Sequence, residues 1–210
     1  MRKPEGMKHV AKLITRGAFA AAGALALSAC VSLGEDPPDS LLTLTPATTA
    51  AKGSVATAST SDSSRAIAVL PIDTPAKLDV NRVPVAMSDT QVAYLQDAVW
   101  IEKPARLFRR LLGETMRANT NTLVIDNDET PLLAAQTLRG TLREMGYDAA
   151  TSTVVVQYDA LRTNIDGTVT SRRFEARESG VLPDAVSVGP AINRTANTVA
   201  AEVSQWMIGG

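Results

Sequence analysis

Apolar residues recur along residues 104–118 with the spacing of one side of a helix. The segment reads PARLFRRLLGETMRA, and Pro104 suits the first helical position because that position needs no N–H donor. The pattern predicts an amphipathic helix whose inner face is made of Leu107, Phe108, Leu111, Leu112, Thr115 and Met116. The other face carries Arg106, Arg109, Arg110 and Arg117. These arginines are more typical of a solvated face than of a phosphate-binding site.

A second helical pattern covers roughly residues 190–207, near the C-terminal end of the chain. The residues that share one face of this helix are Ile192, Ala196, Val199, Val203 and Trp206. We expect the helix to start at Gly189-Pro190 and to end at Gly209-Gly210.

Other apolar patterns are those of strands. Residues 66–72 (AIAVLPI) predict a strand that is buried on both faces and is ended by Pro71 and Pro75. Asp166-Gly167 is a strong hairpin signal between two β-prone runs, and Ser88-Asp89 suits a second turn. The strands expected on these grounds are 82–87, 91–100, 122–126, 151–163 and 167–179.

Residues 136–145 (QTLRGTLREM) fit two structures. Intrinsic propensity favours a helix, but Gly140 would interrupt it. Leu138, Gly140 and Leu142 also alternate with charged or hydroxyl residues, which is the period of a strand. We therefore expect a strand here.

Together these elements predict an α/β fold, with one domain over residues 65–210. We expect a mixed sheet of five to seven strands covered by two main helices. Upstream, residues 30–64 are expected to form a tether and a low-complexity loop, because residues 46–64 are rich in Ala, Thr and Ser. The short β-prone run 41–45 is a candidate extra strand of the domain.

The first 29 residues have the pattern of a secretory signal. Residues 2–16 carry five basic residues and one acid, and residues 17–27 carry no charge. That uncharged run is shorter than the about 20 residues needed to span a bilayer.

The signal ends in Leu27-Ser28-Ala29-Cys30, which resembles the lipobox of bacterial lipoproteins. The resemblance implies that residues 1–29 are removed and that Cys30 receives fatty acyl groups such as palmitate on its sulfur and its amino group. Several acyl chains would anchor the protein stably to a membrane. A cleaved signal that leaves a free thiol is the alternative. Val31 stands where an aspartate would favour the inner membrane, so enterobacterial sorting rules favour the outer membrane.

Removal of the signal changes the chemistry that the chain could perform. It takes away His9, the only histidine, and leaves 16 basic and 21 acidic residues, a net charge of −5. Zinc sites built on His or Cys, Ser-His-Asp triads and Cys-His pairs are excluded, and nucleic acid is a poor partner. The acidic run DNDE (126–129) lacks the glycine and final glutamate of a calcium loop and predicts a turn. We expect no catalytic residues, cofactor or metal.

The order of these motifs resembles the ABC-type transport auxiliary lipoprotein family, to which the lipoprotein of the paraquat-inducible Pqi system belongs. The resemblance lies in a lipobox, then LLTLTP, then AIAVLPID, and then a hairpin whose end, WIEKP (100–104), leads into the amphipathic helix. An Asp-Gly hairpin and an Ala-rich helix with Trp206 near its end complete it. The sequence departs from the family pattern at Leu41 and Leu42, where aromatic residues are usual, and in the length of loop 46–64.

The resemblance implies a non-catalytic, periplasm-facing component of an Mce/ABC-type or Pqi-like system that moves lipids between membranes. Its partners would be an Mce-type periplasmic protein and the associated membrane components, and association with further copies of itself is left open. One alternative is a structural outer-membrane lipoprotein that supports envelope integrity without a role in transport. A small hydrolase that uses serine or carboxylates is the other alternative.

Overall fold

The computed structural model describes residues 40–56, 66–120, 122–127 and 134–209. The predicted signal peptide, residues 1–29, and the predicted lipidation site, Cys30, lie outside the described residues. So do residues 57–64 of the predicted loop.

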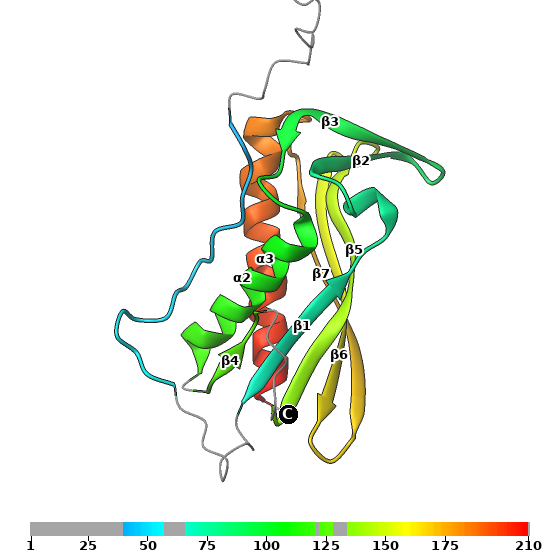
Figure 1. Cartoon of the computed structure of the whole chain (residues 1–210). Coiled ribbons are helices and arrows are strands. Elements are labelled where there is room, and N and C mark those ends of the chain that lie inside the picture. The colour runs from blue at the N-terminus through cyan, green and yellow to red at the C-terminus, as the bar shows by residue number, and fades with distance from the viewer. Residues whose placement is uncertain (1–39, 57–65, 121, 128–133, 210) are drawn as a thin grey trace, which may run out of the picture. The chain divides into compact units, whose positions relative to one another are not determined.

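The described chain folds into a mixed seven-stranded sheet and two long helices (Figure 1). This confirms the predicted α/β class. The strands are β1 (Ile67–Asp73), β2 (Arg82–Ser88), β3 (Gln91–Val99), β4 (Val124–Ile125), β5 (Gln136–Asp148), β6 (Thr153–Asn164) and β7 (Val169–Ser179). The helices are α2 (Pro104–Asn119) and α3 (Ala185–Ile208), with a short 3₁₀ turn η3 (Ala76–Leu78).

Strand β5 organises the sheet because it pairs with three other strands. One of its edges is occupied by β6, which runs antiparallel to it from Gln136↔Asn164 to Asp148↔Thr153. The other edge pairs in parallel with β1 along its first half and with β2 near its end. Antiparallel β3 extends the sheet beyond β2, parallel β4 extends it beyond β1, and antiparallel β7 extends it beyond β6.

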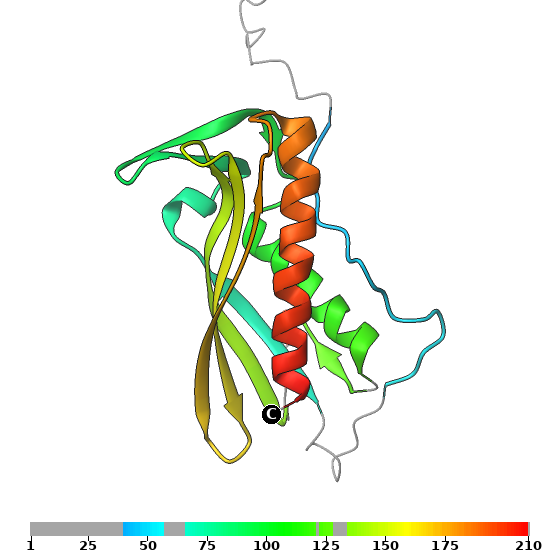
Figure 2. The same ribbon diagram turned by 180° about the vertical axis from the view of Figure 1, so that it is seen from behind.

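Both helices cover the same face of the sheet, as Figure 1 and the reverse view in Figure 2 show. All six residues of the predicted inner face of α2 are buried. Helix α2 packs mainly against β1 and α3, and Phe108 also packs edge-on against Tyr158 of β6 with ring centroids 5.3 Å apart. The helix-covered face is therefore the hydrophobic core, and the opposite face of the sheet is polar.

Gly140 explains why the ambiguous segment 136–145 is a strand. A Cβ atom at this position would lie 2.1 Å from the backbone oxygen of Asp159 and 2.8 Å from the Tyr158 hydroxyl. The missing side chain lets β6 and the Tyr158 ring approach β5 closely, which is a common use of glycine in a strand. The residue that interrupts a helical pattern is thus required by the sheet.

Three strand predictions need correction. Strand β1 continues through Pro71 to Asp73, because the register shifts between Val69 and Ile72 and a proline is tolerated at such an irregularity. Strand β4 is limited to two residues of the predicted run 122–126. Among the described residues, the run 41–45 contributes only an isolated bridge between Leu42 and Trp100.

The predicted start of the C-terminal helix is wrong. Helix α3 begins at Ala185, where the Asp184 side chain accepts a hydrogen bond from the Ser187 N–H and caps the first turn. Pro190 lies inside the helix and cannot donate to the carbonyl of Val186. That carbonyl belongs to a residue that is 85% exposed, so water can replace the missing donor. The predicted end at Gly209 is confirmed.

Candidate interaction surface

An extended segment, residues 40–56, lies along the two helices, and we call it the strap (Figure 1). The Leu42 N–H donates to the Val99 carbonyl (2.7 Å), and the Ile101 N–H donates to the Leu42 carbonyl (2.9 Å). These two bonds join the start of the strap to the end of β3. The strap then runs in the same direction as α3, from Gly189 to Asn197.

Asparagine side chains on α3 hold the strap by its backbone. Asn193 Oδ1 accepts from the Thr45 N–H (2.8 Å), and Asn197 Oδ1 accepts from the Ala47 N–H (2.7 Å). Asn197 Nδ2 also donates to the Thr45 carbonyl (2.9 Å). These asparagines and Gly189 follow each other at intervals of four residues, so they share one side of the helix. A Cβ atom at Gly189 would lie 2.7 Å from Leu42 Cδ2, so Leu42 can pack here only because position 189 has no side chain.

Helix α2 holds the last part of the strap, where the Ala50 N–H donates to Glu114 Oε1 (2.9 Å). Residues 46–56 form no helix or strand, as expected of a loop, but hydrogen bonds at Ala47 and Ala50 attach the segment to both helices. Composition pointed to flexibility because the segment has few apolar side chains. The bonds that hold it use its backbone groups, which composition does not reveal.

The arginine face of α2 is largely bound to protein groups. Arg117 pairs with Asp126 and Glu114, and Arg110 pairs with Glu102. Arg109 Nε donates to the Val69 carbonyl (2.9 Å). The prediction of a solvated face therefore holds only in part, and these three guanidinium groups act as structural links between α2 and its neighbours.

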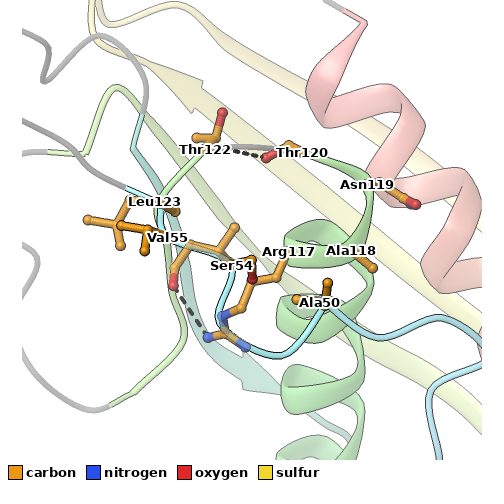
Figure 3. Close-up of a pocket in the computed structure, with 12 residues that line it drawn as sticks. Ala50, Ser54, Val55, Arg117, Ala118, Asn119, Thr120, Thr122 and Leu123 are labelled. Carbon is orange, nitrogen blue, oxygen red and sulfur yellow. Dashed lines mark hydrogen bonds between the residues drawn. The ribbon is translucent and has the colours of Figure 1, made fainter.

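A cavity of about 470 Å³ lies between the strap and the end of α2 (Figure 3). Its walls are mainly small side chains of the strap, such as Ala50 and Ser54, and the chain just after the helix, including Thr120 and Thr122. The charged group in its lining is Arg117, which Asp126 and Glu114 already bind. The described lining thus consists mainly of small side chains and one guanidinium group that protein carboxylates already bind.

The end of the domain at which Ser40 lies carries most of the exposed apolar side chains, and we call it the Ser40 end. It comprises the start of the strap, the β2–β3 hairpin with residues 100–101 that follow it, and residues 182–186, which lead into α3. The strap, the hairpin and α3 meet at this end in both Figure 1 and Figure 2. Of the eleven large apolar residues that are exposed in the described chain, seven belong to these segments. They are Leu41, Met87, Val92, Tyr94, Ile101, Leu182 and Val186.

The polar face of the sheet carries a three-membered ionic cluster. Asp159 on β6 accepts from Arg173 Nε (2.6 Å) and Nη2 (2.8 Å) on β7, and from Arg143 Nε (2.9 Å) on β5. These bonds, first of all those of Arg173, lower the pKa of Asp159 to about 2. The cluster ties three neighbouring strands together across the solvent-exposed face.

Within the described residues, no three His, Cys, Asp or Glu side chains come together in a way that could hold a metal ion. In the same part of the chain, every helix is too short or too polar to cross a bilayer. Cys30 remains the predicted lipidation site, and its surroundings lie outside the described residues.

Comparison with known proteins gives one family match. The model of a family described as the ABC-type transport auxiliary lipoprotein component matches residues 43–204, which include most of the strap, all seven strands and nearly all of α3. No curated protein matches the chain.

Two crystal structures share the fold. One, of a protein from Xanthomonas campestris, has a TM-score of 0.62 and 16% identity, with 80% of this chain and 94% of that chain covered. The other, of an uncharacterized protein, has a TM-score of 0.61 and 17% identity, with 69% of this chain and 92% of that chain covered. At this level of identity the likeness concerns the fold alone.

Proposed function

Because the chain belongs to the family of ABC-type transport auxiliary lipoprotein components, we propose that it is a non-catalytic component of an Mce-type or Pqi-like system that moves lipids between membranes. In this proposal Cys30 carries the lipid anchor, and the domain faces the periplasm from the outer membrane. The observation that carries the proposal is the family match over residues 43–204, which spans the domain and the strap together.

The strap supports a role in holding a partner near a membrane. Only residues 31–39 separate Cys30 from Ser40, where the described chain begins, so the two Cα atoms are at most about 35 Å apart. If all of residues 30–64 were free, the reach would be about 115 Å. A domain on the shorter connection stays close to the surface that anchors it, and would present its partner there.

The partner proposed for the domain is an Mce-type periplasmic protein of the same organism. The test is chemical crosslinking of intact membranes, followed by recovery of the full-length protein and identification of what is attached. We expect an Mce-type protein or a permease component, with or without added nucleotide or metal. A deletion strain should also become sensitive to detergent, because its lipid barrier would be compromised.

The matched control is Cys30→Ser, which should not incorporate labelled palmitate and should lose its place in the outer-membrane fraction. If this variant still fractionates with the outer membrane and is still labelled, the anchor is assigned wrongly. If the wild type repeatedly recovers no transport component, and deletion changes neither detergent sensitivity nor lipid distribution, the structural-lipoprotein alternative replaces the transport role.

A further inference from the structure

Three of the exposed apolar residues of the Ser40 end, Leu41, Ile101 and Val186, lie on segments that contact one another. Leu41 precedes Leu42, which bonds to Ile101 and lies against Gly189. Val186 comes three residues before Gly189 in the helix, so it lies on the same side, one turn nearer this end. Leu41 and Ile101 are 50% and 54% exposed, and Val186 is 85% exposed. The start of the strap, the end of β3 and the first turn of α3 thus present apolar groups together.

The β2–β3 hairpin adds to this surface. Val92 lies opposite Ala86, and Tyr94 lies opposite Pro84, so these four side chains share one face of the hairpin. Met87, near the turn, is 52% exposed, and Val92 is 49% exposed. These residues extend the set of exposed apolar side chains at the Ser40 end along the hairpin.

Chain length indicates what covers it. The strap fixes Ser40 at this end, and Cys30 is ten residues upstream, so the Ser40 end cannot be more than about 35 Å from the acylated residue. Helix α3 alone, with 24 residues, is about 36 Å long. The end of the domain that carries the apolar side chains is therefore the end nearest to the anchor along the chain, and the connection allows it to reach lipid.

We propose that the Ser40 end lies on the lipid surface to which the protein is anchored, with Leu41, Met87, Val92, Ile101, Leu182 and Val186 inserted among the headgroups. This inference rests on the proposed acylation of Cys30. Insertion of a few apolar side chains is weak on its own. A short anchor strengthens the insertion, because it keeps the apolar side chains near the bilayer and so raises their effective concentration at the lipid surface.

The charged groups near this surface indicate whether the lipid needs anionic headgroups. Asp89, Asp97 and Asp184 lie on these segments, Lys103 is paired with Asp79, and Glu102 is paired with Arg110. Arg82 lies over the Tyr94 ring, 5.9 Å from its centroid. The surface has no excess of positive charge among these groups, so contact with lipid would be apolar and would not require anionic headgroups.

The experiment uses fluorescent labels on the acylated full-length protein in vesicles. The chain has one cysteine, which acylation occupies, so a second cysteine introduced by substitution is the only free thiol. An environment-sensitive fluorophore is placed at Val186→Cys or Met87→Cys, and at Ile165→Cys in the β6–β7 turn at the other end as the matched control. All three positions are more than half exposed, so the label should not disturb folding.

The vesicles contain phosphatidylethanolamine and phosphatidylcholine with quencher-bearing acyl chains, with or without phosphatidylglycerol. We expect quenching at positions 186 and 87, severalfold less at 165, and no dependence on phosphatidylglycerol or salt. Flotation with the vesicles reports the anchor separately. If the protein floats but labels 186 and 87 are not quenched, or label 165 is quenched equally, the inference is wrong. If the protein does not float, Cys30 does not anchor it to lipid, and the inference, which rests on that anchor, is also wrong.

Discussion

Asp159 shows how single residues stabilise the exposed side of this sheet. Its carboxylate is 26% exposed and bonds to guanidinium groups of two neighbouring strands. The arginines are 53% and 60% exposed, so solvent screens the attraction, and the cluster is worth about 1 kcal/mol rather than the full value of the pKa shift.

This cluster predicts a pH dependence. Because folding lowers the pKa of Asp159 to about 2, its stabilisation is complete above the ordinary carboxyl pKa and is lost as the pH falls through about 2. Asp159→Asn should therefore lower the unfolding free energy by about 1 kcal/mol near pH 7, and by progressively less as the pH approaches 2. Urea unfolding of both proteins across this range checks the prediction. A difference that stays constant with pH would contradict it, and Asp89→Asn, in the exposed β2–β3 turn, is the control.

At the scale of elements, the notable contact is between α3 and the strap. Helix side chains here take the place of a neighbouring strand, since amides of Asn193 and Asn197 bond to the backbone of an extended segment. An amide side chain can do this because it carries both an acceptor and a donor. The strap is therefore ordered by a few polar bonds and by Leu42 and Leu44, while the rest of the domain is ordered by a large core.

The contact predicts local loosening without global unfolding. The double variant Asn193→Ala/Asn197→Ala removes the bonds to Thr45 and Ala47, each worth about 1 kcal/mol, so exchange of these two amides should become roughly 30- to 100-fold faster. The melting temperature should change little, because alanine is the better helix former. Hydrogen exchange read by NMR measures both amides. Thr198→Ala, on the same helix, is the matched control, and unchanged exchange in the double variant would show that other contacts hold the strap.

For the whole molecule, one hydrophobic core joins the sheet to both helices. It extends from Ile67 in β1 through Phe108 in α2 and Tyr158 in β6 to Met207 at the end of α3. Because the same cluster includes side chains from both helices and the sheet, the domain should unfold in a single cooperative transition.

Two neighbouring residues of α2 test this core. Leu111 is 1% exposed, so Leu111→Asp would bury an unpaired charge and should unfold the domain or destabilise it by several kcal/mol. Arg110→Ala removes an exposed ion pair with Glu102 and should change stability by no more than about 1 kcal/mol. Melting curves by circular dichroism separate the two variants. Equal melting temperatures would mean that the buried face of α2 is assigned wrongly.

The sequence predicted those parts of the fold that depend on side-chain pattern. The periodic apolar residues of α2 were sufficient to predict a helix, and the alternation around Gly140 was sufficient to predict a strand, because the burial of apolar side chains leaves this pattern in the sequence. The start of α3 was missed because Asp184 caps the helix through Ser187, a weaker signal than Gly189-Pro190. The path of the strap was missed because Asn193 and Asn197 bind backbone groups, which every residue carries. The family was predicted from the order of the motifs, and the match over residues 43–204 confirms it.

The direction of the strap has a mechanical consequence. It runs beside α3 in the same sense from Leu42 to Ala47, so a pull on Ser40 that is directed along the helix acts across its hydrogen bonds to Asn193 and Asn197. Under such a load the bonds are sheared together and share the force, whereas a pull directed away from the helix would break them one at a time. The attachment therefore resists tension along the helix better than tension away from it, even though each of its bonds is weak.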